Sequence, residues 1–206
     1  MTLAEPRTEG VMDIVGVVSG DGRNLATAPR LIAFCGKPYA GKSTAARRLV
    51  DSHGFVRTSF ATPLKAMLTL LMRSQGATAD EVDKALAGSG KERPCRYLAG
   101  ATPRQAMQTL GTEWGRALHP EFWVRAWAQA LPEGRDIVVD DLRFANEGAA
   151  VKRLGGVVVR IVCPAVPGLS GPAAMHASEQ ESLAVDAEVV NDGDLARLWE
   201  RVDRLA

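Results

Sequence analysis

The sequence predicts a three-layer α/β protein in which helices cover both faces of a mostly parallel, five-stranded sheet. Short apolar runs alternate with segments of helical periodicity, at residues 31–35, 55–60, 136–141, 157–162 and 188–190. The first run leads into a glycine-rich loop and then a helix, and the third ends in two carboxylates. Because ligands of such sheets bind at the carboxyl ends of the strands, we expect the functional site at that edge.

The glycine-rich loop matches the P-loop pattern and reads Gly36-Lys37-Pro38-Tyr39-Ala40-Gly41-Lys42-Ser43. Its glycines let backbone N–H groups turn toward a phosphate chain, and the N-terminus of the next helix adds positive potential. Lys42 can reach the β- and γ-phosphates, and the Ser43 hydroxyl can ligate Mg²⁺. The pattern therefore predicts an ATP site made by Gly36, Lys37, Tyr39, Ala40, Gly41, Lys42, Ser43 and Thr44.

Composition narrows the class of protein. The 206 residues suffice for one domain with a sizeable core. The formal net charge of +1 argues against a nucleic-acid coat or a membrane-surface patch, so phosphate binding should be local. Cys35, Cys95 and Cys163 lack metal-ligand spacing and are typical of thiols in a reducing, intracellular location. No apolar run approaches the ~20 residues of a membrane span.

Residues 1–29 are expected to form an N-terminal extension to a domain at residues 30–206. Residues 1–10 are polar and expected to be disordered, whereas residues 11–18 are apolar enough for an edge strand. The residues leave open whether that strand docks on the domain. The mixture of acidic and basic residues does not fit a signal peptide.

The region between the second and third strands is expected to be helical. Thr62 and Pro63 suggest a helix capped by the threonine, with Leu64, Met67, Leu68 and Leu71 on its apolar face. Residues 78–81 and 102–105 are capping boxes that predict two further helix starts. Between them, residues 87–101 break the helical pattern and carry a cluster of cations, Lys91, Arg93 and Arg96.

The helix after residue 102 has an unusual second face. Its apolar residues are Met107, Leu110, Trp114 and Leu118, while the other face carries Arg104, Gln108, Gly111, Thr112 and Gly115. Glycine costs about 1 kcal/mol inside a helix, so these glycines suggest close approach of a ligand or another backbone. Pro120 is expected to start the next helix, with Trp123, Ala126, Trp127 and Ala130 facing inward.

The third strand ends in Asp140-Asp141 and is followed by Leu142-Arg143. This is the form of a Walker B element, although the residues do not decide which aspartate acts. A helix at residues 145–154, a Pro/Gly-rich loop from residue 164 and a C-terminal helix with an apolar stripe complete the chain. The small size and the lack of a guanine-type NKxD run favour a small-molecule kinase.

From residue 31 onward the chain resembles the bacteriophage deoxynucleoside monophosphate kinases, P-loop enzymes distantly related to adenylate kinase and phosphomevalonate kinase. Besides the P-loop, the resemblance rests on Ala61-Thr62-Pro63-Leu64-Lys65, on the segments at residues 103–113 and 122–124, and on Asp141-Leu142-Arg143-Phe144-Ala145-Asn146-Glu147. The segments at residues 176–179 and 190–195 also match. The order and spacing of these segments are more specific than any one of them.

The resemblance implies a P-loop kinase fold that transfers the γ-phosphoryl group of ATP to a deoxynucleoside 5′-monophosphate, with Mg²⁺ as cofactor. It implies catalysis by Lys42, Arg143 and Asp141, with Asp141 acting on the metal through water or on the acceptor, and metal binding by Ser43. It implies acceptor binding by Lys65, Arg104, Gln108, Gly111, Thr112, Arg116 and Trp123, in a helical region at residues 61–131. Arg104 and Arg116 could instead form structural ion pairs with Glu113 or Glu121. A phage-encoded enzyme would act in the cytoplasm of its host.

This chain departs from the pattern at the lid-like loop, residues 164–182. Relatives often carry arginine before the proline that ends the fourth strand, where this chain has Cys163, and no Lys or Arg occurs between Arg160 and Arg197. Such a loop cannot clamp phosphates with cations. We therefore expect Arg143, together with Lys91, Arg93 and Arg96, to close over the phosphates.

Two other functions stay open from the sequence. The same scaffold could phosphorylate another acceptor, such as phosphomevalonate or dephospho-coenzyme A. A nucleotide-binding regulatory or assembly ATPase is the alternative of a different class, although it would not need the polar face at residues 104–115. We expect no nucleic-acid or membrane partner, and the tryptophan stripes of two helices are compatible with a homodimer.

Overall fold

The computed structural model describes residues 30–166 and 183–206. The edge strand expected at residues 11–18, the segment at residues 176–179 and most of the lid-like loop lie outside the described residues. Within the described ranges, no helix is long and apolar enough to cross a membrane.

The sheet has five strands that all run parallel, which confirms the predicted α/β class. They are β1 (Leu31–Cys35), β2 (Val56–Thr58), β3 (Ile137–Val139), β4 (Val157–Val162) and β5 (Ala187–Val190). Their order across the sheet is β2-β3-β1-β4-β5. The chain therefore places β2 and β3 on one side of β1 and β4 and β5 on the other. The loop after β1 lies at this switch point, where such sheets bind ligands.

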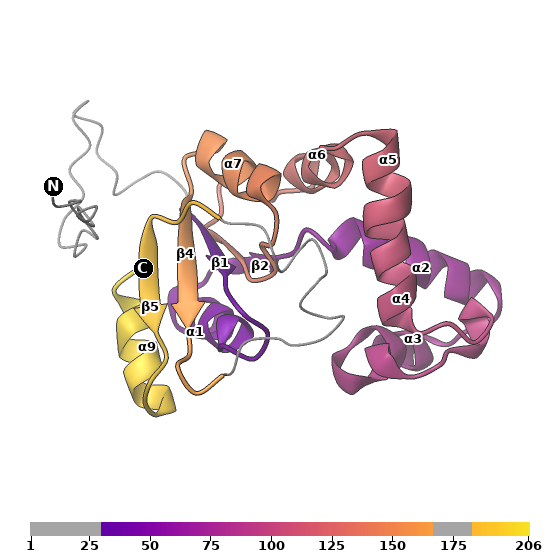
Figure 1. The fold of residues 1–206 in the computed structure, drawn as a ribbon, viewed down its shortest axis with the longest axis horizontal. Coiled ribbons are helices and arrows are strands. Elements are labelled where there is room, and N and C mark those ends of the chain that lie inside the picture. The colour runs from indigo at the N-terminus through magenta and orange to yellow at the C-terminus, as the bar shows by residue number, and fades with distance from the viewer. Residues whose placement is uncertain (1–29, 167–182) are drawn as a thin grey trace, which may run out of the picture.

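Helices cover both faces of this sheet (Figure 1). On one face α1 (Lys42–His53) and α9 (Leu195–Asp203) bury residues such as Leu49 and Leu198 against Phe34 and Val159. On the other face α7 (Ala145–Arg153) and α6 (Phe122–Gln129) bury Val151 and Trp127. Alternate residues of β1, β3 and β4 contribute to the two cores, as expected of strands that are buried on both sides.

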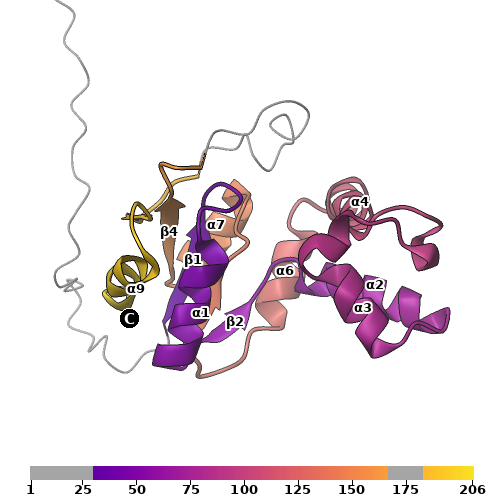
Figure 2. The ribbon, with the colours of Figure 1, turned by 90° about the horizontal axis from the view of Figure 1, so that it is seen from below.

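The remaining helices form a lobe beside the sheet, as Figures 1 and 2 show. They are α2 (Thr62–Ser74), α3 (Ala79–Leu86), two 3₁₀ turns (Gly88–Glu92 and Arg96–Leu98), and a helix made of α4 (Pro103–Gln108), a π-helical stretch (Thr109–Gly115) and α5 (Arg116–Leu118). This helical lobe has a core of its own around Leu68, Met72, Val82 and Cys95. Both capping boxes are present, at Thr78 with Glu81 and at Thr102 with Gln105.

The start of α2 corrects the sequence prediction. The helix begins one residue earlier than expected, so Thr62 is its first residue rather than its cap, and the Asp141 carboxylate accepts the N–H groups of Phe60 and Ala61 just before it. These contacts also turn the chain away from the sheet, so β2 is shorter than the predicted strand at residues 55–60. The buried face of α2 is Leu64, Leu68 and Met72, whereas Met67 and Leu71 are exposed.

The helices that carry the tryptophans also differ from the prediction. Helix α6 begins at Phe122 rather than Pro120, and Ala130 is exposed after its end. Trp123 and Trp127 are buried, while Trp114 and Leu118 are exposed. Trp114 lies within a π-helical stretch and Leu118 follows it, and the wider turn of this stretch rotates side chains away from the positions that α-helical spacing predicts.

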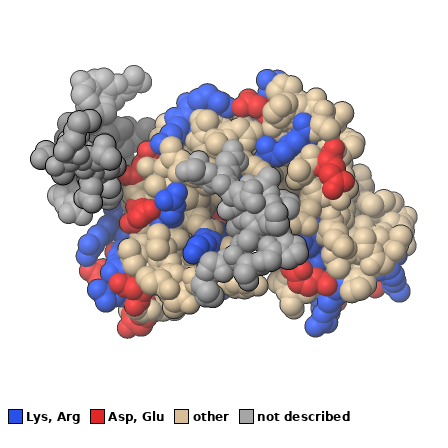
Figure 3. Space-filling model, in the orientation of Figure 1, with Lys and Arg blue, Asp and Glu red and all other residues tan. Residues whose placement is uncertain are grey.

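Charged side chains of both signs are interspersed over the described part of the surface drawn in Figure 3. This distribution agrees with the formal net charge of +1. Attraction of a polyanion by the whole surface is therefore weak, and anion binding depends on local groups.

Candidate active site

The loop between β1 and α1 has the backbone of a phosphate-binding loop. Gly36, Tyr39 and Gly41 have positive φ angles of 127°, 64° and 106°. A Cβ at Gly36 would lie 2.3 Å from the Ile161 carbonyl oxygen, so only glycine fits there. The Lys42 ammonium donates to the carbonyls of Gly36 and Lys37, at 2.6 Å each. The lysine thus lies over the loop whose N–H groups would cradle phosphates.

The side chain of Tyr39 stands out in this loop. It is 93% exposed, although its residue holds a left-handed backbone conformation that favours glycine. Ala40 is buried beneath it, and its carbonyl accepts a hydrogen bond from Asn191 after β5. The loop is therefore held against β4 and the end of β5 on one side, and it exposes the Tyr39 ring on the other.

The two aspartates after β3 have separate environments. Asp140 is 7% exposed and accepts hydrogen bonds from Ser43 Oγ at 2.6 Å and from Arg57 Nε at 3.1 Å. Asp141 accepts from the Ser59 hydroxyl and from the backbone at the start of α2. Asp140, rather than Asp141, therefore lies beside the P-loop serine.

Strand geometry explains this correction. Adjacent strand residues point to opposite faces, and Val138 packs in the core under α1 while Val139 packs in the core under α6 and α7. Asp140 continues the Val138 side, where α1 presents Ser43. Arg57, which the sequence interpretation missed, reaches the same carboxylate from β2.

Ser43 and Asp140 have the chemistry of a magnesium site. A hydroxyl and a carboxylate oxygen converge at 2.6 Å, and Mg²⁺ prefers oxygen ligands. Protein magnesium sites of this kind use one or two carboxylates and leave the other positions to water and substrate phosphates. The residues present therefore fit the ion that the P-loop pattern implies.

Arg143 lies in the turn between β3 and α7, and Glu147 of α7 fixes the backbone of this corner. The Glu147 carboxylate accepts the N–H groups of Arg143 and Phe144, at 2.8 and 3.1 Å. Burial raises the pKa of Glu147 to about 7, and the Asp141 charge adds to this, while the two N–H donors and Arg116 oppose it. The corner that positions Arg143 is thus built around a buried carboxyl group.

Arg116 reaches this corner from the helical lobe. Its Nη2 lies 3.4 Å from Glu147 Oε1, and its guanidinium lies 3.7 Å from the centre of the Phe144 ring. Its partners are therefore neither of the two glutamates that the sequence suggested. Arg116 joins the lobe to the strand end.

Three cations lie close enough to Lys91 for their charges to act on it. Burial lowers the pKa of Lys91, and the charges of Lys65, Arg104 and Arg143 lower it further, whereas Asp140 raises it. These groups come from α2, the first 3₁₀ turn, α4 and the loop after β3. Arg104 is held by Glu92, with Nε 2.5 Å from the carboxylate. We call Lys65, Lys91, Arg104 and Arg143 the cation cluster.

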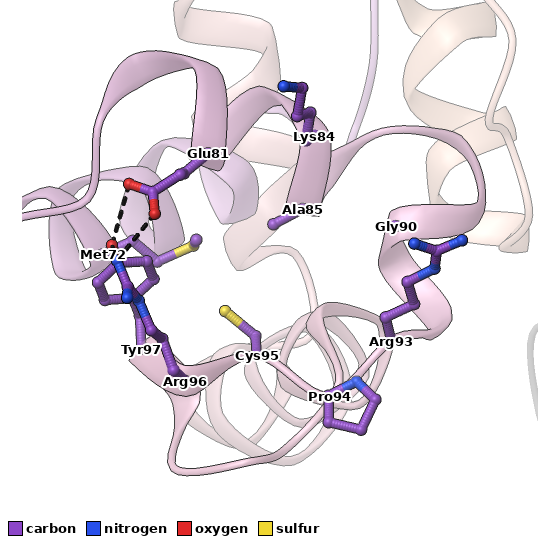
Figure 4. A pocket seen from close by; sticks show the side chains of 10 residues that line it. All are labelled: Met72, Glu81, Lys84, Ala85, Gly90, Arg93, Pro94, Cys95, Arg96 and Tyr97. Atoms are coloured by element: carbon purple, nitrogen blue, oxygen red, sulfur yellow. Dashed lines mark hydrogen bonds and ion pairs between the residues drawn. The ribbon is translucent and has the colours of Figure 1, made fainter.

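The other two predicted lid cations lie elsewhere. Arg96 donates to Glu81 at 2.8 Å and stacks on Tyr97, on the rim of a pocket of about 270 Å³ in the outer part of the lobe (Figure 4). Arg93 lines the same pocket. Of the three cations in residues 87–101, the structure therefore brings only Lys91 to the cluster.

The glycines of the helix after residue 102 are explained by Trp123 of α6. A Cβ at Gly115 would lie 2.2 Å from Trp123 Nε1, and this indole N–H donates to the Gly111 carbonyl at 2.9 Å. Trp123 is only 4% exposed. The close approach that the sequence suggested is thus made by an indole ring, whereas Gln108 and Thr112 are exposed.

A cleft of about 480 Å³ opens between the P-loop and the ends of β3, β4 and β5. Its polar lining combines groups that the sequence singled out with two that it did not. The lining residues include Gly36, Lys37, Lys42, Arg143, Arg160 and Glu188. Arg160 and Glu188 were missed because an isolated charge in a strand carries no motif.

Comparison with known proteins finds a viral relative. No family model matches the chain. The chain is 30% identical over 192 residues to an Acanthamoeba polyphaga mimivirus protein named "Putative deoxynucleotide monophosphate kinase", covering 84% of this chain and 93% of the relative.

Solved structures that align with this chain include TT1252 from Thermus thermophilus, with a TM-score of 0.45, 19% identity, and coverage of 86% of this chain and 96% of that one. A structure from Chloroflexus aurantiacus described as "a putative kinase" has a TM-score of 0.41, 14% identity, and coverage of 87% and 96%.

A parallel sheet whose first strand runs into a P-loop, with a carboxylate on the P-loop serine, is the arrangement of P-loop nucleotide-binding proteins. The chain belongs to the family of the mimivirus deoxynucleotide monophosphate kinase homologue. It is a kinase of that family.

Proposed function

We propose that this kinase transfers the γ-phosphoryl group of ATP to a deoxynucleoside 5′-monophosphate, giving a deoxynucleoside diphosphate and ADP. The observation that carries the proposal is the cation cluster beside the P-loop. The charges of Lys65, Arg104 and Arg143 lower the pKa of the partly buried Lys91, and Asp140 is close enough to oppose them. An anionic second substrate would relieve their repulsion.

The donor side would be the P-loop. Lys42 would release the carbonyls of Gly36 and Lys37 and bind the β- and γ-phosphates. Ser43 and Asp140 would hold Mg²⁺, which when bound neutralises charge on the phosphates. The exposed ring of Tyr39 lies on the same loop and would contact the bound nucleotide.

The acceptor side would be the inner face of the helical lobe. Lys65, Lys91 and Arg104 would bind the acceptor phosphate, and the exposed Gln108 and Thr112 would face its nucleoside. The name of the mimivirus relative supports a deoxynucleotide as this acceptor. Arg116 and Trp123 would act indirectly, since Arg116 contacts the corner after β3 and Trp123 holds Gly111 of the lobe to α6.

In phosphoryl transfer the protein itself would form no covalent bond to the transferred group. An acceptor phosphate oxygen attacks the γ-phosphorus as the bond to the bridging oxygen breaks, and the electron pair of that bond stays on ADP. Arg143 would stabilise the charge on the transferring group from its fixed corner. Positioning and charge neutralisation would supply most of the rate enhancement.

The test is ADP formation from ATP with single added acceptors. The panel is dAMP, dGMP, dCMP and dTMP, the matching ribonucleotides, phosphomevalonate and dephospho-coenzyme A. We expect ADP to form only with one or more deoxynucleoside monophosphates. ADP formation with another acceptor would overturn the assigned substrate, and ADP formation without any acceptor would indicate a regulatory ATPase.

A further inference from the structure

Arg160 lines the cleft but belongs neither to a recognised sequence motif nor to the cation cluster. It lies on β4, directly beside Cys35 of β1 and Glu188 of β5 in the parallel register. Because paired residues of neighbouring strands share a face, these three side chains stand in one row across the sheet. The row starts at the carboxyl end of β1, where Cys35 precedes Gly36 of the P-loop.

The contacts of Arg160 hold it in place. Its Nη1 donates to Glu188 Oε1 and its Nη2 to the Leu183 carbonyl, both at 3.0 Å. A guanidinium has five N–H donors in a fixed plane, so these two bonds orient the group without using up its donors. Its charge also lowers the pKa of the buried Cys35 thiol, against the larger effect of burial. The positive charge is therefore effective at the base of the P-loop.

Stability alone does not account for this pair. The side chains of Arg160 and Glu188 are 35% and 40% exposed, and exposed ion pairs contribute little to folding. Both residues line the cleft with Lys42 and Arg143. Moreover, the 36 residues from Ile161 to Ala196 contain no Lys or Arg, so the chain that follows β4 brings no cation to this side of the site.

We propose that Arg160 binds the γ-phosphate of the nucleoside triphosphate during transfer, with Glu188 as its positioning residue. The role of Arg160 during transfer rests on the proposed function. Its binding to the γ-phosphate does not depend on which acceptor is used. The guanidinium would donate N–H groups to the γ-phosphate oxygens and would neither lose nor gain a proton. The bond from the acceptor oxygen to phosphorus forms, the bond to the bridging oxygen breaks, and the leaving charge stays on the diphosphate.

The test compares binding of ADP and of a non-hydrolysable ATP analogue by calorimetry, with no acceptor present. Arg160→Gln should weaken analogue binding by about tenfold or more and leave ADP binding unchanged, since only the analogue has a γ-phosphate. In the kinase assay kcat should fall by about 10²–10³-fold, as when one donor to a transition-state oxygen is removed. Glu188→Gln should lower kcat less and leave ADP binding unchanged.

Lys152 of α7 provides a matched control. It forms a similar ion pair with Asp186, at 2.7 Å and with 39% and 37% exposed side chains, outside the cleft. Lys152→Met should change neither binding nor kcat. Equal weakening of both nucleotides by Arg160→Gln, or no weakening, would overturn the proposal. The two proposals can fail separately. If the wild type phosphorylates no deoxynucleotide, the proposed substrate is wrong. If Arg160→Gln nevertheless weakens binding of the analogue and not of ADP, the role of Arg160 stands.

Arg160→Lys covers the case in which Arg160→Gln does not fold. It keeps the charge but replaces the planar fork with a single ammonium, so kcat should fall by about tenfold. Unchanged kcat in a folded Arg160→Lys protein, with unchanged analogue binding, would contradict a bidentate role.

Discussion

Neighbouring residues can have unrelated tasks, as Asp140 and Asp141 illustrate. Asp140 contacts Ser43 and Arg57, whereas Asp141 closes the turn between β2 and α2. The first contact set belongs to the proposed donor site, and the second lies where the helical lobe begins. The two aspartates therefore make a matched pair for substitution.

Asp140→Asn is expected to raise the Mg²⁺ concentration for half-maximal activity by about 10–100-fold, since it removes a charged oxygen from the metal environment. Asp141→Asn should keep the Mg²⁺ requirement but lower the free energy of unfolding by about 1–3 kcal/mol, because the acceptor of the N–H groups at the start of α2 is weakened. Magnesium titration of activity and denaturant unfolding measure the two effects. An Asp141→Asn protein with the larger change in Mg²⁺ requirement would reverse the assignment.

Glu147 predicts a pH dependence of stability. Burial raises its pKa in the folded protein from an ordinary 4.5 to about 7. The folded state therefore binds more protons than the unfolded state between these pH values, so stability falls as pH rises through this window. The loss from this group is about 3 kcal/mol, at 1.36 kcal/mol per pKa unit.

The measurement is Tm at several pH values from 5 to 8 for wild type and Glu147→Gln. Glutamine retains a carbonyl oxygen for the N–H groups of Arg143 and Phe144 but does not titrate. The variant should gain Tm relative to wild type as pH rises. Parallel pH curves for the two proteins would show that Glu147 does not titrate in this range.

At the scale of elements, the helix from α4 to α5 depends on its contact with Trp123. Gly115→Ala would place a methyl group 2.2 Å from the indole, so we expect a loss of about 1–3 kcal/mol or more in the free energy of unfolding. Gly111→Ala is the matched control, because its Cβ would meet only Leu64 at an ordinary 3.5 Å. That variant should be unchanged or more stable by up to about 1 kcal/mol. Equal losses in chemical denaturation would refute this view of the helix.

Elements that depend on close sequence neighbours could be predicted. The capping boxes at Thr78 and Thr102 and the P-loop are such cases, because each uses groups only a few residues apart. Features set by distant contacts could not. The face of Asp140 depends on strand register, and the glycine at position 115 depends on an indole from another helix. Arg96 was expected over the phosphates, but its partner Glu81 lies on α3.

For the whole molecule, the two substrates would bind on different parts. The P-loop belongs to the sheet, and three members of the cation cluster belong to the helical lobe. Arg143 lies where the two parts meet, on a corner that Arg116 of the lobe also contacts. Substitutions in the lobe should therefore affect the acceptor more than ATP.

Lys91→Ala is expected to raise the KM for the deoxynucleoside monophosphate by about 10–100-fold with little change in the KM for ATP, since a hydrogen bond to a charged group contributes about 1.5–3 kcal/mol. Arg96→Ala removes a cation from the same segment but from the outer pocket, and should leave kcat/KM unchanged. Steady-state kinetics with each substrate varied will measure both. If Arg96→Ala raises the KM for the deoxynucleoside monophosphate more than Lys91→Ala does, the acceptor binds at the outer pocket and not at the cation cluster.

The most direct measurement of the central claim follows the γ-phosphoryl group itself. With ATP labelled at the γ-phosphate and a deoxynucleoside monophosphate present, the label should appear in the deoxynucleoside diphosphate, with one ADP formed per labelled product. Release of the label as inorganic phosphate, or its absence from every deoxynucleotide, would contradict the account.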